Sequence, residues 1–349
     1  MKLAILPGDG IGPEICAVTV AVLKKLDLGL TFETHEIGHA SLKKEGSTFP
    51  PRVLEACRAA DGIVIGPVSH LDYPPRAQGG ANPSGDLRIA LDLYANIRPA
   101  RSRKSLPHWG RTPMDLVIVR ENTEGFYSDR NMHLGIGEFM PTPDVALSVR
   151  KITAQGSRRI ARAAFEMARA RRKKLTAVHK INVLKVTEGL FLQETRKMSE
   201  EFKDVAYEEQ LIDSMAALLV RDAARFDVVV TTNMYGDILS DEASELSGSL
   251  GLAASINAGE RHCMAQAQHG SAPDIAGQDK ANPASLVLSA GMLLGWLGLK
   301  RKNQKFLEAE KAIEQAIDAL IEDPKTRTRD LGGTLGTRAF GEKIAAKLN

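Results

Sequence analysis

The sequence has few cysteines and no long hydrophobic run. Its three cysteines, Cys16, Cys57 and Cys263, lie far apart in a chain of 349 residues and form no CxxC pair. This spacing argues against a disulfide framework and against a cysteine-built zinc site, and it favours small buried thiols. No apolar stretch is long enough to span a bilayer, and the opening MKLAILPGDGIGPE lacks a signal-peptide pattern. We therefore expect a soluble, cytoplasmic protein with no membrane contact.

The chain also has little excess of either positive or negative charge. The 46 Lys and Arg nearly balance the 43 Asp and Glu, which leaves a net charge of +3. The densest cationic run, residues 169–174, follows the apolar positions Ile160, Ala164 and Met167, which recur at helical spacing. Cations at a helix C-terminus complement its dipole. Because no aromatic pattern accompanies the run, we expect a solvated helix end and no nucleic-acid partner.

Short β-rich runs alternate with helical patterns along the chain. This alternation predicts an α/β protein with much parallel sheet, and the length favours two domains. The segment 127–147 has weak periodicity and several Gly and Pro, which indicates an arm or hairpin outside the sheet. The expected strands are LAIL at 3–6, IVIG at 63–66, LVIV at 116–119, LTAV at 175–178 and VVVTT at 228–232.

The opening glycine loop, residues 8–12, follows the first expected strand and precedes a helical pattern with Pro13 in its first turn. It lacks the full G-x-G-x-x-G spacing, and the acidic residue expected about twenty positions later has no clear candidate. A tight turn explains the glycines equally well. A nucleotide bound here would need an architecture other than the Rossmann fold.

Two carboxylates, Asp237 and Asp241, stand four residues apart in TTNMYGDILSDEASELSGSLG. Helical spacing puts both on one face, where a cation would relieve their repulsion. Two carboxylates with substrate oxygens and water suit Mg²⁺ or Mn²⁺. Alternatively, Asp237 caps the helix and Asp241 is merely solvated. The residues alone leave both interpretations open.

Other polar residues form three further candidate groups. Arg88, Arg98 and Arg120 could together grip a multiply carboxylated substrate, although an isolated arginine is usually a surface ion-pair partner. Tyr127 in RENTEGFY and Lys180 in HKINVLK could exchange protons with a substrate. A carboxylate in the polar loop 269–283, such as Asp274, could hold the ribose hydroxyls of NAD and repel a 2′-phosphate.

Several motifs together carry a family resemblance. There are seven motifs, which run in the right order across nearly the whole chain: the opening LPGDGIGPE, then DLYANIRP, RENTEGFY, HKINVLK, NMYGDILSDEASELSGSLG and HGSAPDIAG, and the closing TRDLGGT. The chain thereby resembles the isocitrate/isopropylmalate dehydrogenase family, the metal-dependent β-decarboxylating dehydrogenases. The resemblance implies a two-domain α/β/α fold that is not a Rossmann fold. The first domain would comprise 1–98 and 252–349, and the second 99–251 with a dimer clasp near 127–155.

The resemblance also implies roles for individual residues. Arg88, Arg98 and Arg120 would bind the malate core of the substrate, while Asp237 and Asp241 would bind Mg²⁺ or Mn²⁺. Asp213 and Lys180 would come from the partner subunit of a homodimer, so that active sites are shared. The adenosine of the cofactor would contact the loop residues His269, Gly270, Ser271, Ala272, Asp274, Ile275 and Asn282. Related NADP enzymes carry a basic and an aromatic residue at positions 274 and 275, so this chain is expected to use NAD.

The implied reaction converts a small hydroxy di- or tricarboxylate to a 2-keto acid. Lys180 would take up the hydroxyl proton, hydride would pass to NAD⁺, and Tyr127 would protonate the carbon after CO₂ leaves. Asn82 and Ser84 give a polar pocket, which favours isocitrate, homoisocitrate, D-malate or tartrate over 3-isopropylmalate. Ile181 and Gln266 depart from the usual family residues. A metal-independent 2-hydroxy acid dehydrogenase and a non-catalytic binding paralogue are the alternatives.

Overall fold

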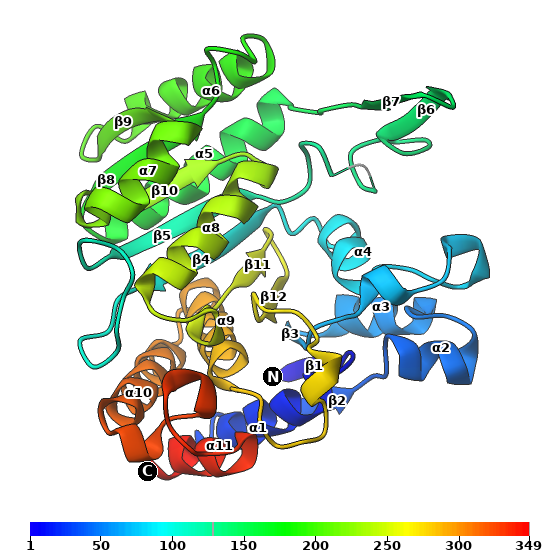
Figure 1. Ribbon diagram of the computed structural model, residues 1–349, viewed down its shortest axis with the longest axis vertical. Helices are drawn as coiled ribbons and strands as arrows, with labels where there is room; N and C mark the ends of the chain where they lie inside the picture. Colours follow the sequence, from blue (N-terminus) through cyan, green and yellow to red (C-terminus); the bar gives the residue numbers. More distant parts are fainter. Residues whose placement is uncertain (128, 349) are drawn as a thin grey trace. The chain divides into compact units, whose positions relative to one another are not determined.

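The computed structural model describes residues 1–127 and 129–348, which divide into two compact units. Unit 1 comprises 1–91, 103–107 and 249–349, and unit 2 comprises 92–102 and 108–248. Figure 1 shows the chain leaving unit 1 and returning to it near the C-terminal third, so that both termini belong to unit 1. The domains 1–98 plus 252–349 and 99–251 stay a prediction.

The strands of unit 1 form one predominantly parallel arrangement in the order β2-β1-β3-β12-β11. β1 lies parallel to both β2 and β3, β12 is parallel to β3, and β11 pairs antiparallel with β12. In a Rossmann sheet of order 3-2-1-4-5-6 the first strand lies between the second and the fourth. The order 2-1-3 in unit 1 is different, as the incomplete glycine fingerprint predicted. The strands are β1 (Lys2–Leu6), β2 (Thr31–Thr34), β3 (Gly62–Ile65), β11 (Ile256–Ala258) and β12 (Cys263–Gln266).

The helices of unit 1 cover this sheet, and α9 is its central packing element. α9 packs against β12 and against both α1 and α10, which buries most of its apolar residues. α1 begins at Gly12 with a proline in its first turn, as predicted. The helices are α1 (Gly12–Lys25), α2 (His39–Glu45), α3 (Pro51–Ala59), α4 (Pro83–Ala90), α9 (Ala284–Arg301), α10 (Gln304–Glu322) and α11 (Thr337–Ala346).

The strands of unit 2 that form its main sheet run in the order β4-β5-β10-β8-β9. β4 is antiparallel to β5, and the remaining neighbours are parallel. Consecutive strand residues point to opposite faces, so both faces need apolar cover. Val117 and Val119 of β5 pack with α5 and α6, whereas Leu116 and Ile118 pack with α7 and α8. The strands are β4 (Ala95–Arg101), β5 (Asp115–Glu121), β8 (Lys174–His179), β9 (Ala206–Leu211) and β10 (Val228–Thr231).

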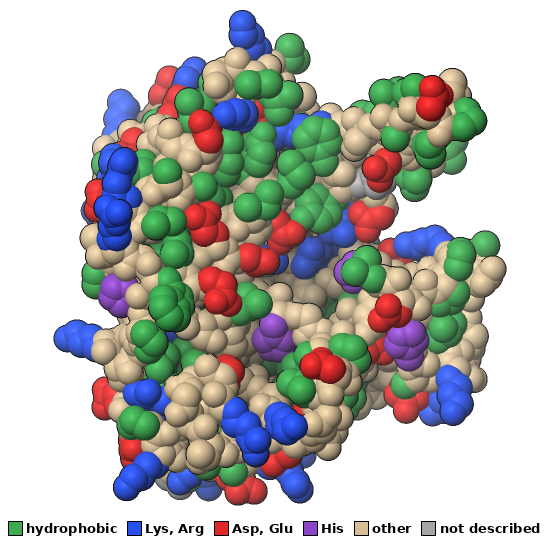
Figure 2. All heavy atoms as spheres, viewed as in Figure 1, with side chains coloured by type: hydrophobic (Ala, Val, Ile, Leu, Met, Phe, Trp, Pro, Cys, Tyr) green, Lys and Arg blue, Asp and Glu red, His purple; other side chains and the backbone are tan. Residues whose placement is uncertain are grey.

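Unit 2 also carries an arm outside its main sheet. β6 (Glu138–Thr142) and β7 (Val145–Ser148) form a separate antiparallel pair that extends away from the unit's helices in Figure 1. This confirms the predicted hairpin. Figure 2 shows apolar side chains gathered on the arm, and those exposed include Phe139, Met140 and Leu147. The helices of unit 2 are α5 (Ala154–Ala170), α6 (Thr187–Glu201), α7 (Ile212–Asp222) and α8 (Asn233–Ser247).

The cysteines are buried as the sequence predicts, whereas part of the cationic run pairs with a buried carboxylate and is not only solvated. All three cysteines are buried free thiols, and burial raises the pKa of Cys16 and of Cys57 to about 12. α5 ends at Ala170. Arg169 in its last turn pairs with Asp204, and Arg171 just after the helix pairs with Asp227. Among the residues that the structure describes, no helix has the length and apolarity needed to cross a membrane.

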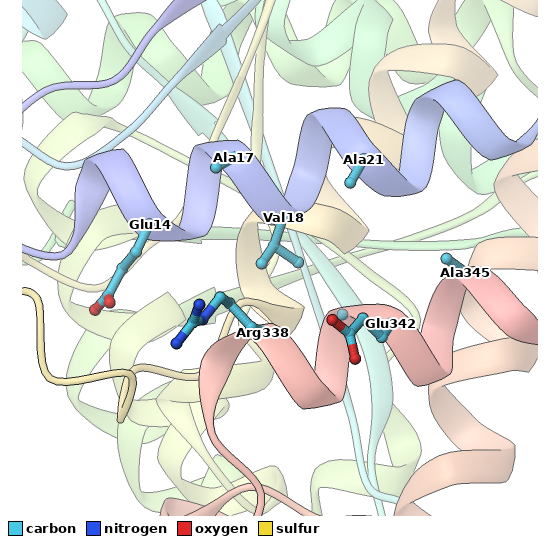
Figure 3. A pocket seen from close by; sticks show the side chains of 8 residues that line it. Glu14, Ala17, Val18, Ala21, Arg338, Glu342 and Ala345 are labelled. Atoms are coloured by element: carbon cyan, nitrogen blue, oxygen red, sulfur yellow. The ribbon is translucent and has the colours of Figure 1, made fainter.

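A groove of about 310 Å³ lies between α1 and α11 in unit 1 (Figure 3). Its floor is apolar, with Val18 pointing from α1 toward α11, and Glu14 and Arg338 lie at one end. None of the predicted site residues lines it. The lining residues are Glu14, Ala17, Val18, Ala21, Arg338, Gly341, Glu342 and Ala345.

Candidate active site

Most of the predicted site residues of unit 2 gather where β4 and β5 face α8. In the antiparallel register Asn96 lies opposite Arg120 and Arg98 lies opposite Ile118, which places Arg98 and Arg120 on the same face. Ile118 on that face packs with α8 residues. The two arginines are therefore directed toward the helix that carries Asp237 and Asp241.

Arg98 is buried and joins the two carboxylates. Its Nη1 lies 3.1 Å from Asp237 Oδ1 and donates to Asp241 Oδ1 at 3.2 Å and to Ser240 Oγ at 2.7 Å. Burial, reinforced by the neighbouring positive charge of Arg120, lowers the pKa of Arg98 to about 10, while Asp237 and Asp241 oppose that shift. The guanidinium is therefore still charged near neutral pH.

Arg120 is the most buried charged group of this cluster. Its Nε and Nη2 donate to Asn233 Oδ1 at 2.9 and 2.7 Å, and its Nη1 donates to Asp237. Gly236 makes this approach possible, because a Cβ at that position would lie 2.6 Å from Cβ and Cγ of Arg120. The glycine in NMYGD thus allows α8 to pack directly on the arginine.

Asp237 does not cap its helix, which removes the alternative interpretation of this residue. α8 begins at Asn233 after Thr232 and has no side-chain cap. Asp237 instead accepts hydrogen bonds from Arg120 and from the Tyr127 hydroxyl. Burial raises the pKa of Asp241, and Arg98 partly offsets this effect. Both carboxylates therefore belong to the arginine cluster.

Tyr127 completes the cluster in unit 2. Its ring centroid lies 5.1 Å from the guanidinium carbon of Arg120 and equally far from that of Arg130. Burial raises the pKa of the phenol, and its hydroxyl donates to Asp237. The phenol is therefore protonated near neutral pH and has a hydrogen available for transfer.

Lys180 and Asp213 form a separate pair. Lys180 Nζ donates to Asp213 Oδ1 at 2.6 Å, and this bond lowers the pKa of Asp213. The Lys180 backbone N–H donates to Glu188, a fully buried residue that pairs with Arg150. Within the described residues, no hydrogen bond or ion pair of Lys180 or Asp213 reaches the Asp237 cluster.

The acidic residues of one chain only partly fit a divalent cation. Asp237 and Asp241 offer carboxylate oxygens on one helix face, which suits a hard ion that keeps several waters. In residues 1–127 and 129–348, no group of three Asp, Glu, His or Cys is arranged to hold a metal. A third carboxylate from another chain or from a substrate would complete such a site.

The predicted substrate residues of unit 1 lie around α4. Arg88 Nη2 donates to Gln266 Oε1 at 3.0 Å, and Ser84 Oγ lies 3.1 Å from the same oxygen. Asn82 caps α4 by accepting from Gly85 N–H at 3.2 Å. The structure thus gives Asn82 a helix-capping contact, whereas Ser84 and Arg88 share a partner on β12.

The predicted cofactor loop is tied to the opening glycine loop. Ile11 N–H donates to Ser271 O at 2.8 Å, and Ser69 Oγ lies 2.8 Å from Ser271 Oγ. A Cβ at Gly10, whose φ is +57°, would lie 1.9 Å from Ser271 O. Glycine at position 10 is therefore needed for both the turn and the close approach.

His269 and Asn282, at the two ends of the predicted cofactor loop, differ in their hydrogen bonding. Burial lowers the pKa of His269, and its buried Nε2 has no hydrogen-bond partner in the described part of the chain. Asn282 donates to Asp330 at 2.9 Å and accepts from Ala284 N–H at 2.9 Å, which anchors the loop to α9. Asp274 is exposed in the short helical turn Pro273–Ile275.

Several contacts of the predicted site residues were not predicted from the sequence. Asn233 and Ser240, which hold Arg120 and Arg98, lie in the same motif as the aspartates but look like ordinary polar helix residues. Glu188 accepts from the Lys180 backbone N–H and is itself paired with Arg150. The location of Asn233 two residues after the buried strand β10 is the signal that could have indicated a role for it.

The fold and these clusters describe an α/β protein with a cluster of arginines and aspartates beside a protonated phenol. Residues 2–344 match the family Isocitrate/isopropylmalate dehydrogenase, and the chain belongs to this family. It is accordingly a decarboxylating dehydrogenase that oxidises a hydroxy acid. The resemblance predicted from the motifs is confirmed.

Individual relatives extend over the whole chain. A 3-isopropylmalate dehydrogenase from Archaeoglobus fulgidus is 40% identical, with 100% of this chain and 99% of the relative covered. An isocitrate/homoisocitrate dehydrogenase from Thermus thermophilus is also 40% identical, with 99% and 98% covered. The crystal structure of isocitrate dehydrogenase from Methylococcus capsulatus is 38% identical with a TM-score of 0.88 and covers 99% of each chain. The predicted fold is confirmed.

Proposed function

We propose that this chain catalyses the NAD-dependent oxidative decarboxylation of a malate-type (2R)-hydroxy acid to a 2-keto acid and CO₂. The observation that carries the proposal is the cluster of Arg98, Arg120, Tyr127, Asp237 and Asp241, which combines two guanidiniums, two carboxylates and a protonated phenol. Arginine forks match substrate carboxylates. A phenol that keeps its proton can deliver it to a carbon after CO₂ leaves.

The metal site would be shared between subunits. Asp237 and Asp241 would supply two ligands, and Asp213 of the partner subunit would supply the third. With Mg²⁺ or Mn²⁺ bound, the substrate hydroxyl loses its proton more readily and the charge that develops after CO₂ loss is stabilised. Lys180 of the partner subunit would take up the hydroxyl proton, and Tyr127 would return one to carbon.

The cofactor would bind at the loop 269–282. The unpartnered Nε2 of His269 is available to a nucleobase, and the exposed Asp274 carboxylate can accept from two ribose hydroxyls. The same carboxylate would repel a 2′-phosphate. These features support NAD over NADP.

The substrate is tested directly by NADH formation with Mn²⁺ from D-malate, isocitrate, homoisocitrate, 3-isopropylmalate and tartrate. Each reaction is repeated with NADP⁺ and with EDTA. We expect one preferred acid, a higher kcat/KM with NAD⁺ than with NADP⁺, and loss of turnover in EDTA. Turnover that persists in EDTA would instead indicate a metal-independent 2-hydroxy acid dehydrogenase. Complete inactivity of the folded protein toward every acid would favour a non-catalytic binding paralogue.

A homodimer with shared active sites is the second part of the proposal. The exposed apolar side chains on the β6–β7 arm offer a surface for a second copy, and Lys180 pairs with Asp213 outside the Tyr127 cluster. Mixing inactive Lys180→Met and Tyr127→Phe chains would form heterodimers in which one site regains both groups. About a quarter of wild-type activity should return after statistical exchange of subunits in a two-fold dimer. No recovery after verified exchange would place both residues of a site in one chain.

A further inference from the structure

Asp9, in the opening glycine loop, is a buried carboxyl that joins three parts of unit 1. Its Oδ1 accepts from the backbone N–H of His39 at 2.8 Å, and its Oδ2 accepts from the backbone N–H of Ser69 at 3.0 Å. Oδ2 also accepts from the Tyr73 hydroxyl. The donors come from segments that are 30 or more positions away in the sequence, and Asp9 is only 7% exposed.

Ser69 links Asp9 to the predicted cofactor loop. While its N–H donates to Asp9, its Oγ lies 2.8 Å from Ser271 Oγ. The glycine loop holds the same serine, because Ile11 N–H donates to Ser271 O at 2.8 Å. A change in the position of Ser271 is therefore passed to Ser69 and to Asp9 through direct hydrogen bonds.

Tyr73 lies in a segment, residues 67–82, that leads from β3 to the predicted substrate residues at the start of α4. Most residues between 70 and 78 are exposed. The far end of the segment is held by Thr48, whose Oγ1 accepts from Ala81 N–H at 2.7 Å. A segment with little buried surface opens at a low free energy. Its conformation therefore depends on the few side chains that bind it.

The Tyr73 hydroxyl can be removed without removing the other contact of the ring. Burial, and then the bond to Asp9, raise the pKa of the phenol, so the hydroxyl keeps its hydrogen and donates. The ring also packs edge-on against His39, with the ring centroids 5.0 Å apart. Phenylalanine at position 73 would keep this ring contact and lose only the bond to Asp9.

We propose that Asp9 is a positioning residue that couples the cofactor loop to the 67–82 segment, so that an adenine nucleotide bound at the loop tightens the binding of the acid. The inference rests on the proposed function, because it takes the loop 269–282 as the cofactor site and Ser84 and Arg88 as substrate-binding residues. By linkage, the acid tightens the binding of the nucleotide by the same factor.

The physical basis of the coupling is the entropy of the exposed segment. A nucleotide that orders the cofactor loop also fixes Ser271 and Ser69, and through Asp9 it fixes Tyr73. The acid then binds to a site whose neighbouring segment is already ordered, so the entropy that its binding must remove is smaller. The bonds act in series, and breaking any one of them should end the coupling.

The test uses ADP-ribose, which has the adenosine and both phosphates of NAD but no nicotinamide. No hydride transfer can occur, and direct contact between the nicotinamide and the acid is removed. Calorimetry with Mg²⁺ measures the Kd of the most tightly bound acid of the panel, with and without saturating ADP-ribose. In the wild type, ADP-ribose should lower this Kd at least about fivefold. NADH serves as the nucleotide if ADP-ribose does not bind.

Two hydroxyl variants break the chain of bonds on either side of Asp9. Ser69→Ala and Tyr73→Phe should each reduce the coupling to below about twofold, and the double variant should show no further loss. Tyr207→Phe and Ser199→Ala, which remove hydroxyls bonded to Glu209 and to a helix carbonyl, are the matched controls and should keep the full factor. A purely structural role would weaken acid binding equally with and without ADP-ribose.

A third variant changes Asp9 itself. Asp9→Asn keeps the volume but replaces one acceptor oxygen with an NH₂ group that would face a donor. It should lose the coupling as well, and the two hydroxyl variants decide if it does not fold. Hydrogen exchange gives a readout that needs no acid. ADP-ribose should slow the exchange of backbone amides in residues 69–80 of the wild type, but not in Ser69→Ala.

The outcomes separate this inference from the proposed function. A wild-type coupling below about twofold, or one that either hydroxyl variant leaves intact, overturns the inference while the dehydrogenase function stands. A wild type without turnover, in which the nucleotide tightens acid binding and both variants remove the effect, overturns the function and supports the inference. A wild type that binds neither ADP-ribose nor NADH overturns both.

Discussion

The predicted substrate-binding arginines of the two units differ in the side chains with which they form hydrogen bonds. In unit 2, Arg98 and Arg120 meet the carboxylates of Asp237 and Asp241. In unit 1, Arg88 meets the neutral amide of Gln266. An arginine held by carboxylates within its own chain is fixed strongly but has part of its charge compensated. The hydrogen bond to Gln266 orients the Arg88 guanidinium without placing a further negative charge beside it.

The comparison predicts different consequences when each arginine is removed. Arg120→Met removes the buried guanidinium that bonds Asn233 and Asp237, although Arg98 still lies 3.1 Å from Asp237, and should destabilise the fold by about 2–3 kcal/mol. It should also lower kcat/KM by about 10³-fold, because transition-state charge loses a fixed donor. Arg88→Met should cost about 1–2 kcal/mol of stability for the lost hydrogen bond to the neutral Gln266 amide. Its kinetic defect should lie mostly in KM.

Chemical unfolding and steady-state kinetics on both variants check this difference, with the exposed Arg111→Met as control. Equal losses of stability in Arg120→Met and Arg88→Met would break the comparison. An Arg120→Met enzyme with nearly wild-type kcat/KM would remove the cluster of unit 2 from the substrate site.

The next largest effect is expected from the phenol of unit 2. Tyr127→Phe keeps the ring beside Arg120 but removes the hydroxyl that donates to Asp237. General-acid groups contribute about 10²–10⁴-fold, so kcat should fall at least 10²-fold while substrate Kd changes little. Tyr207→Phe, which removes a hydroxyl bonded to Glu209 at 2.9 Å, is the matched control. Unchanged turnover of Tyr127→Phe would disprove the assignment.

A smaller effect should follow from displacing Arg120 without removing it. In Gly236→Ala the new methyl would lie 2.6 Å from Arg120 Cβ and Cγ, so the arginine or α8 must shift. Misplacing a positioning group by about 1 Å can cost up to roughly 10²-fold, and we expect at least tenfold in kcat/KM. Gly291→Ala in α9, where the nearest atoms are at an ordinary 3.5 Å, should be as active as wild type. Equal activities of the two variants would show that the close approach does not position Arg120.

The smallest effect concerns a half-buried carboxyl that lies outside both clusters. Burial, and secondarily Glu314, raise the pKa of Glu310 to about 7 from 4.5. Between these pH values the unfolded chain releases a proton that the folded chain keeps, so this group makes the fold less stable as pH rises. Glu310→Gln should therefore stabilise the protein by on the order of 2 kcal/mol at pH 8.

Thermal unfolding at pH 8 and pH 5 measures this effect, and the gain should be much smaller at pH 5. Glu308→Gln on the exposed side of α10 should show no comparable pH-dependent gain. A stabilisation of Glu310→Gln that is the same at both pH values would contradict the shifted pKa.

The buried strands were predictable because their apolar character is continuous. β5 and β10 are covered on both faces, so their runs of Val, Leu and Ile are unambiguous. β4 escaped prediction because Arg98 and Arg101 interrupt it, and β9 because its AYEEQL sequence is only partly buried. Their strand conformation is set by pairing with β5 and β8, which is a tertiary effect.

The candidate site was predictable in its residue types but not in its pairings. Helical spacing placed Asp237 and Asp241 on one face, and the motifs selected the three arginines. The sequence could not show that Arg98 and Arg120 meet those aspartates while Arg88 meets Gln266, because each contact joins residues more than a hundred positions apart. Such contacts depend on strand register and on Gly236, whose missing side chain gives no periodic signal.

The most direct test of the account is the stoichiometry of the reaction with the preferred acid. NADH and CO₂ are quantified together in the presence of Mn²⁺, after EDTA treatment, and after Mn²⁺ is restored. The account predicts equal amounts of NADH and CO₂, loss of both in EDTA, and recovery of both with Mn²⁺. NADH formed without CO₂, or formed equally well in EDTA, would contradict it.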